Sequence, residues 1–118
     1  MIVVIFLSLG LFGYSFRAVD WFAAIPGDLG DARFNSIILE HLYGWVTGSC
    51  KSLWSPTFFF PFENVLAFSD NHFGSAWSYI FLRLAGFERE IAYSGWYVIG
   101  NVLNFVAAFC VMGHCLAA

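Results

Sequence analysis

The distribution of charge along the 118 residues constrains this chain more than any single motif does. All of its charged side chains, five Lys or Arg and eight Asp or Glu, lie between Arg17 and Glu90. Residues 91–118 therefore form an uncharged run. A bilayer core about 30 Å thick needs about 20 apolar residues of helix, so this run is long enough to cross with some tilt. The sequence predicts a transmembrane helix over 91–118.

A second uncharged run occupies residues 1–16 and would reach only about 24 Å as a helix. To cross a bilayer it must continue through Arg17 as far as Ile25, so we expect a first transmembrane helix over residues 1–25. A cleaved signal peptide is the competing interpretation. Only the α-amine is positive before Arg17, and Gly13-Tyr14-Ser15 matches a small-residue cleavage site poorly. A retained anchor is therefore the preferred interpretation.

The composition agrees with a membrane protein and excludes other classes. Hydrophobic residues make up 60% of the chain and charged residues 11%, whereas a soluble domain has about 25% charged residues. The net charge is -3 and no cluster of Lys and Arg is present, which excludes nucleic acid as a partner and leaves the lipid bilayer. The three cysteines fit no disulfide framework.

The connecting segment, residues 26–90, contains two predicted helices. The first covers about 31–45, with Asp31 as its N-cap. Its apolar stripe consists of Phe34, Ile37, Ile38, Leu42 and Trp45, and its polar face of Arg33, Ser36 and Glu40. An amphipathic helix of this kind suits the plane of the membrane interface.

The second predicted helix covers about 74–85 and ends at Gly86. It is too short to cross a bilayer, so we expect it to be juxtamembrane or re-entrant. Between the two helices lies an aromatic run, Phe58 to Phe62, interrupted by Pro61. Burial against lipid headgroups or against other transmembrane helices explains such a run.

The predicted fold is thus an all-α membrane protein with two transmembrane helices, 1–25 and 91–118, joined by a loop with two interfacial helices. Two helices bury little surface against each other in lipid. We therefore expect this chain to be the amino-terminal piece of a larger multi-span protein, whose remaining transmembrane helices are its partners.

Two acidic residues, Asp28 and Asp31, are the first candidates for chemistry. They lie about one helical turn apart beside Gly27 and Gly30, whose backbone permits close approach of a ligand. Paired carboxylates can hold a divalent cation or provide a general base. In the structural alternative, Asp31 only caps the helix and Asp28 only faces water.

Asp70 and His72 form a second polar cluster, with a solvated turn as the structural alternative. Within the second predicted transmembrane helix, Asn101 and Asn104 lie three residues apart and therefore share a face. An amide in hydrocarbon needs a partner, so this face is expected to pack on other helices.

Several short motifs follow one another in a particular order. They are Gly27-Asp28-Leu29-Gly30-Asp31-Ala32-Arg33-Phe34, Leu39-Glu40-His41, Trp54-Ser55-Pro56-Thr57-Phe58-Phe59-Phe60-Pro61, Ala67-Phe68-Ser69-Asp70-Asn71-His72, Leu84-Ala85-Gly86 and Asn104-Phe105. This order resembles the amino-terminal part of GT-C-type membrane proteins, the polyprenyl-phosphate-sugar-dependent glycosyltransferases, and in particular a large bacterial group among them. The resemblance covers nearly the whole chain.

The resemblance implies a multi-span protein of the bacterial inner membrane with a long first exoplasmic loop. It implies that an acidic residue of this loop acts as catalytic base or metal partner near a polyprenyl-phosphate sugar donor. Asp31 fits that role best by position and Asp28 is the second choice. Arg33, Asp70 and His72 are the corresponding substrate-binding candidates, with Arg33 holding phosphate or pairing with Asp28.

A divalent cation is the one cofactor that this resemblance suggests, and which residues would bind it is left open. The transmembrane helices that would form the donor pocket are not part of this chain, so the piece alone is expected to be inactive. The competing hypothesis is a non-enzymatic small membrane protein, such as an assembly subunit or a transporter piece. In that case the acidic loop would serve helix capping and topology only.

Overall fold

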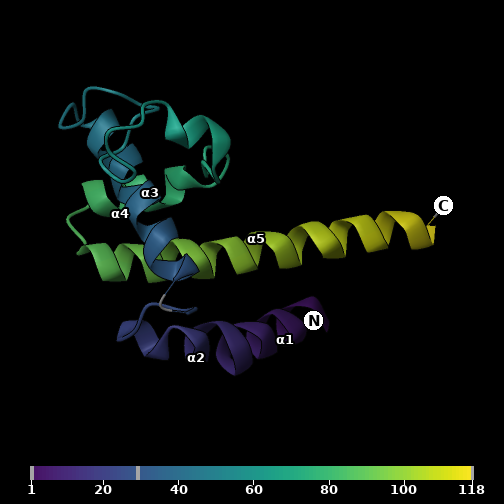
Figure 1. Cartoon of the computed structure of the whole chain (residues 1–118). Helices are drawn as coiled ribbons and strands as arrows, with labels where there is room; N and C mark the ends of the chain where they lie inside the picture. The colour runs from purple at the N-terminus through teal and green to yellow at the C-terminus, as the bar shows by residue number, and fades with distance from the viewer. Residues whose placement is uncertain (1, 29, 118) are drawn as a thin grey trace.

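The computed structural model describes residues 2–28 and 30–117, and all of its regular elements are helices. The all-α prediction is confirmed for this part of the chain. Figure 1 shows a long helix beside a shorter helical segment, with two further helices and a long loop packed on the first half of the long one. We call these two helices and their loop, residues 31–84, the cap.

The amino-terminal helical segment covers residues 2–18. It consists of α1 (Ile2–Gly10), the π-helical turn η1 (Leu11–Ser15) and α2 (Phe16–Ala18). The predicted end at Ile25 is wrong: the chain leaves the helix after Ala18, because Asp20, Trp21 and Phe22 adopt left-handed φ angles of 44°, 54° and 72°. These three residues form the turn η2 (Asp20–Phe22) that leads the chain back toward the cap.

The long helix is α5 (Arg89–Ala117), where the sequence predicted 91–118. Among the residues described, one helical stretch, Arg89–Cys115, is long and apolar enough to cross a membrane by length and composition. The apolar stretch of the first segment, Val3–Ala18, is shorter than a bilayer core requires. By length and composition, α5 alone qualifies as a membrane-spanning helix among the described residues. The expectation of a second full-length transmembrane helix over residues 1–25 is not confirmed.

The first helix of the cap is α3 (Asp31–Val46), one residue longer than predicted. Its buried residues are Ala32, Ser36, Ile38, Leu39, Leu42 and Gly44. Of the predicted apolar stripe, Ile38 and Leu42 are buried, whereas Ile37 and Trp45 are 40% and 44% exposed. Because α3 packs against both α4 and α5, Ile38 and Leu39 lie in the core. The expected interfacial placement of the stripe stays a prediction.

The second helix of the cap is α4 (Ala76–Leu84), followed by a turn at Gly86, where φ is 92°. This turn sends α5 back along α4, and the two helices make the most extensive contact in the fold. Gly95 of α5 permits the contact, because a Cβ atom there would lie 2.5 Å from Cδ1 of Leu82. α4 therefore packs along the first half of α5 (Figure 1). Its expected juxtamembrane or re-entrant placement stays a prediction.

The core of the cap lies between α3, α4 and the loop that joins them. Ile38, Leu39, Leu66 and Tyr79 are fully buried there. The loop is held in place by the His41 ring, whose Nε2 lies 3.1 Å from the carbonyl oxygen of Leu53. Leu66 belongs to the short helix η3 (Val65–Phe68).

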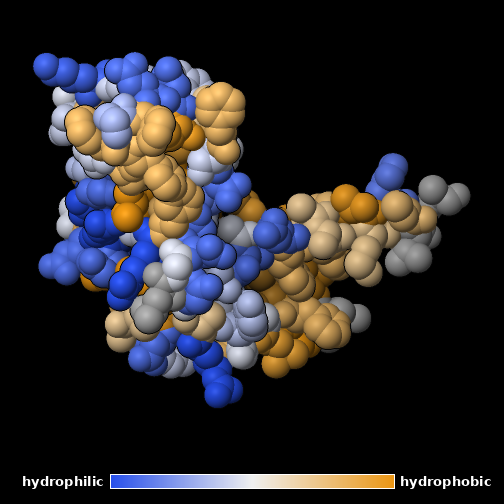
Figure 2. Space-filling model, in the orientation of Figure 1, coloured by the Kyte–Doolittle hydropathy of each residue, from blue (hydrophilic) through white to orange (hydrophobic). Residues whose placement is uncertain are grey.

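The surface divides into two regions. Figure 2 shows hydrophilic residues over much of the cap and hydrophobic residues over the second half of α5 and the amino-terminal segment beside it. In that half of α5, Val106, Phe109, Val111 and Met112 are between 44% and 63% exposed. Large exposed apolar surfaces of this kind mark contact with lipid or with other protein chains.

Candidate functional site

The predicted acidic residues line a hollow where α3 begins beside α5. The hollow has a volume of about 340 Å³. It is lined by Pro26, Gly27, Asp28, Asp31, Ala32, Asn35, Tyr93, Trp96 and Tyr97. Two carboxylates, an amide and three aromatic side chains thus face one space, which we call the acidic hollow.

Asp28 shapes the backbone of this hollow. Its Oδ1 accepts the backbone N–H of Gly30 at 2.9 Å and that of Asp31 at 2.7 Å. These bonds satisfy two of the amide groups at the start of α3 that have no partner within the helix. The sequence assigned the cap to Asp31, and that assignment is wrong: Asp28 is the capping carboxylate, and Asp31 is the first residue of the helix.

Asp31 is exposed, and its carboxylate has no hydrogen-bond partner in the described part of the chain. It lies in the first turn of α3, where the helix dipole favours a negative charge. Of the two acidic residues, Asp31 is therefore the one whose carboxylate is available to a ligand in the hollow.

The structure links His72 to this hollow through Asn35. His72 Nε2 lies 3.0 Å from Asn35 Oδ1, within hydrogen-bond distance. The His72 ring also contacts Trp96 edge-on, with ring centroids 5.3 Å apart. Burial lowers the pKa of His72, and the nearby carboxylate of Asp70 opposes this shift. Asp70 itself is exposed and does not line the hollow.

Arg33 lies elsewhere. It lines a separate hollow of about 290 Å³ together with Ile25, Ser36, Ile37, Arg89 and Glu90. The expected pairing of Arg33 with Asp28 is wrong: the ion pair in the described residues joins Arg83 and Glu40. Arg33 follows Asp31 by two helical positions, which turns the two side chains to different faces of α3.

The Arg83–Glu40 pair fastens α4 to α3. Arg83 donates from Nε at 3.1 Å and from Nη2 at 2.9 Å, and Tyr79 donates its hydroxyl to the same carboxylate. Hydrogen bonding to Glu40 raises the pKa of Arg83. Burial, and then Glu40, raises the pKa of Tyr79. The Arg83 guanidinium also lies 5.0 Å from the ring centroid of Tyr43.

A polar stripe continues from the acidic hollow along α5 toward its apolar half. Trp96 and Tyr97 also line a second hollow of about 360 Å³, which includes both Asn101 and Asn104, so these two amides share a face as predicted. The Tyr97 hydroxyl donates to the Tyr14 hydroxyl at 3.3 Å, which ties α5 to the amino-terminal segment.

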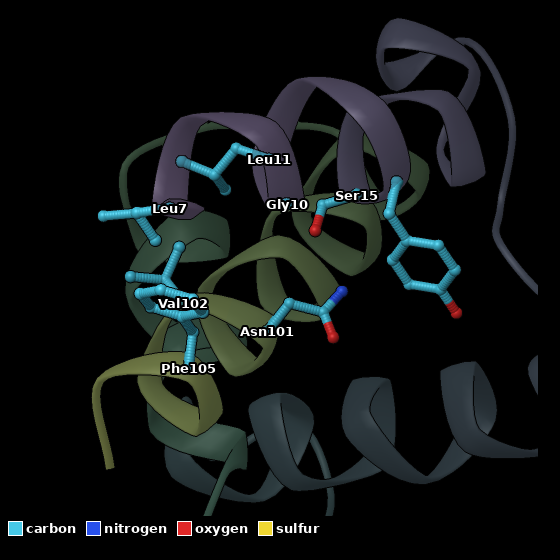
Figure 3. Close-up of a pocket in the computed structure, with 8 residues that line it drawn as sticks. Leu7, Gly10, Leu11, Ser15, Asn101, Val102 and Phe105 are labelled. Carbon is cyan, nitrogen blue, oxygen red and sulfur yellow. The ribbon is translucent and has the colours of Figure 1, made fainter. Parts of the chain in front are cut away.

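A fourth, smaller hollow of about 180 Å³ lies between the amino-terminal segment and α5 (Figure 3). Ser15 and Asn101 face it from opposite sides, and Leu7, Leu11 and Val102 supply its apolar wall. The Nδ2 atom of Asn101 is buried without a hydrogen-bond partner among the described residues.

The residues do not form a complete metal site. No group of three His, Cys, Asp or Glu side chains that could hold a metal ion occurs in residues 2–28 and 30–117. Asp28 and Asp31 are two carboxylates, and one oxygen of Asp28 is already bonded to the backbone. Divalent cations such as Ca²⁺ take six or more oxygen ligands, so these two residues alone do not fit the suggested cation.

Sequence reasoning missed four residues of the hollow: Asn35, Tyr93, Trp96 and Tyr97. Asn35 lies one turn after Asp31 on α3, and this spacing could have found it. The three aromatic residues come from α5, and their approach depends on the crossing of two helices far apart in the sequence.

In the comparisons with known proteins, no family model, no curated protein and no solved structure matches this chain.

Proposed function

We propose that this chain is the amino-terminal region of an integral membrane glycosyltransferase of the GT-C type, which takes its sugar from a polyprenyl-phosphate donor. The observation that supports this most is the exposed carboxylate of Asp31 in the acidic hollow. In the reaction, the acceptor hydroxyl attacks the anomeric carbon, the bond from that carbon to phosphate oxygen breaks, and polyprenyl phosphate leaves. Asp31 takes the proton of the acceptor hydroxyl.

The arrangement of the helices supports a membrane setting for this reaction. In the proposal, α5 and residues 2–18 lie side by side in a bacterial inner membrane, with the cap on its exoplasmic face. The contact between Tyr14 and Tyr97 and the exposed apolar residues on the second half of α5 are consistent with this placement. The acidic hollow then lies where α5 leaves the bilayer, within reach of the phosphate end of a lipid-linked donor.

The remaining candidates have supporting parts in this proposal. His72 orients Asn35 toward the hollow, and Asp28 holds the backbone that presents Asp31. Arg33 belongs to the neighbouring hollow with Arg89. It would contact the donor phosphate only if the bound donor extended from the acidic hollow into this neighbouring one. The other transmembrane helices of the complete protein would provide the rest of the donor pocket.

The proposal is tested with the complete protein in proteoliposomes. Polyprenyl-phosphate sugars labelled in the sugar are supplied, and the release of polyprenyl phosphate and the transfer of label are followed. We expect polyprenyl phosphate to be released only when an acceptor is added. This release should be lost in Asp31→Asn. If none of the lipid-linked sugars is turned over while the protein is folded, the transferase assignment is wrong.

One observation favours the non-enzymatic alternative. The bonds from Asp28 to the amides of Gly30 and Asp31 give the acidic motif a sufficient structural role. A non-enzymatic membrane subunit would need this cap but not the carboxylate of Asp31. Function in the cell that survives Asp31→Asn and fails with Asp28→Ala would therefore favour that alternative.

A further inference from the structure

The loop between α3 and α4 carries four phenylalanine side chains on its outer surface. Phe59 is 62% exposed, Phe60 88%, Phe62 73% and Phe68 92%. We call these four residues the phenylalanine patch. Three of the four lie within residues 59–62, and grouped apolar side chains at this level of exposure are seldom left in water by a folded protein.

The backbone beneath the phenylalanine patch is well anchored. The N–H of Leu66 donates to the carbonyl oxygen of Trp54 at 3.1 Å, and the Leu66 side chain is fully buried. Phe58, directly before the patch, packs edge-on against Phe34 of α3, with ring centroids 5.2 Å apart. The same loop thus buries some apolar side chains and presents others, so the exposure of the patch is fixed by the fold.

Part of the loop that carries the patch lies on the side of the cap toward which α5 continues (Figure 1). Figure 1 shows the teal segment that contains η3 at the edge of the cap that faces along α5. Beyond this edge α5 is apolar and exposed (Figure 2). If α5 crosses a bilayer, this edge of the cap faces the membrane surface that α5 enters.

We propose that the phenylalanine patch inserts into the interfacial layer of the bilayer beside α5 and holds the cap against the membrane. Aromatic side chains favour this layer, and residues 52–62 carry no charge that would resist burial. The charged residues of this loop are Lys51, Glu63 and Asp70, all exposed, so the loop carries one positive and two negative charges. Anionic headgroups therefore do not attract the loop, and insertion takes place equally well in zwitterionic lipid.

This inference rests on the crossing of the bilayer by α5 and is independent of the transferase reaction. The test uses the complete protein in phosphatidylcholine nanodiscs, with its native cysteines, Cys50, Cys110 and Cys115 among them, replaced by serine. A nitroxide is attached at a single new cysteine, Phe60→Cys or Phe68→Cys. Exposed Lys51→Cys is the aqueous control in the same loop, and exposed Val111→Cys is the lipid control on α5.

Collisions of each label with oxygen, which concentrates in lipid, are compared with collisions with a water-soluble nickel chelate. We expect the oxygen-to-nickel ratio at 60 and 68 to be several-fold higher than at 51 and closer to that at 111. Adding an anionic lipid should leave these ratios unchanged.

Two results at 60 and 68 would overturn the proposal. Labels that are as accessible to nickel as the label at 51 would place the patch in water. Labels shielded from both reagents would mean that protein covers the patch. A label at 111 that collides mainly with nickel would refute the crossing by α5, and the patch proposal with it, whatever the transferase assay gives.

Discussion

The Oδ1 atom of Asp28 accepts the backbone N–H of Asp31 at 2.7 Å, so the first of the two acidic residues fixes the position of the second. The two carboxylates are chemically identical, but the fold gives them different environments. Asp28 is bonded to the start of α3, whereas the carboxylate of Asp31 projects from the first helical turn at the edge of the acidic hollow. Substitutions at the two positions should therefore have separable effects.

Asp28→Ala removes the acceptor for two amide groups and should lower the free energy of unfolding by about 1 kcal/mol, which is typical of a lost helix cap. Asp28→Asn retains a capping oxygen and should cost only a few tenths of a kcal/mol. Thermal unfolding of both variants, followed by circular dichroism in one detergent, measures the difference. Equal midpoints for the wild type and Asp28→Ala would show that Asp28 does not cap α3.

The Arg83–Glu40 pair should contribute measurably to the stability of the cap. Its side chains are 23% and 30% exposed, and the contact has two hydrogen bonds. A double-mutant cycle of Arg83→Ala and Glu40→Gln should give a coupling energy of about 1–2 kcal/mol. This exceeds the roughly 0–1 kcal/mol of an exposed pair, because the two charges are partly desolvated and the guanidinium makes a bidentate contact with the carboxylate. A coupling energy of zero would mean that packing alone joins α4 to α3.

His72 should make the stability of the cap depend on pH. Burial lowers its pKa below the value of 6.5 that it has in the unfolded chain. As the pH falls through 6.5, the unfolded state takes up a proton before the folded state does, so stability decreases. The full contribution is present above pH 6.5 and is lost as the pH falls to the lowered pKa.

The variant His72→Gln provides the comparison for this effect, because a glutamine amide can still hydrogen-bond to the Asn35 side chain and does not titrate. Unfolding midpoints measured from pH 7.5 down to pH 5 should converge between wild type and variant as the pH falls. Two parallel curves would show that His72 titrates alike in the folded and unfolded states.

Two aliphatic residues on α3, Leu39 and Ile37, separate core packing from surface contact. Leu39 is fully buried and Ile37 is 40% exposed. Leu39→Ala should destabilise the cap by about 2–5 kcal/mol, since it removes buried surface and leaves a cavity. Ile37→Ala should cost less than about 1 kcal/mol in the same chemical denaturation experiment. A reversed order would mean that Ile37, and not Leu39, packs in the core.

The long elements could be predicted from the sequence because their signals are local. The uncharged run after Glu90 predicted α5, and the spacing of apolar residues after Asp31 predicted α3 to within one residue. The end of the amino-terminal segment could not be predicted. Aspartate is common in turns, but Trp21 and Phe22 rarely adopt left-handed φ angles, so a turn over these residues has no clear local signal.

The candidate site was predicted in part. The acidic motif identified Asp28 and Asp31, but either residue can cap a helix, and only the backbone geometry distinguishes them. The contact of His72 with Asn35 joins residues 37 positions apart, and the aromatic wall comes from α5. Such contacts follow from how the helices cross, which no periodicity in the sequence encodes.

The role of Asp31 in sugar transfer is tested most directly by comparing Asp31→Asn with Asp28→Asn in the complete protein. Both changes remove one negative charge from the same motif, and both variants are reconstituted in the same lipid with the same polyprenyl-phosphate sugar. A lost general base typically costs about 10²–10⁴ in rate, so Asp31→Asn should lower turnover at least about 100-fold, while Asp28→Asn should retain most of it. Undiminished turnover in Asp31→Asn would contradict the proposed role of Asp31.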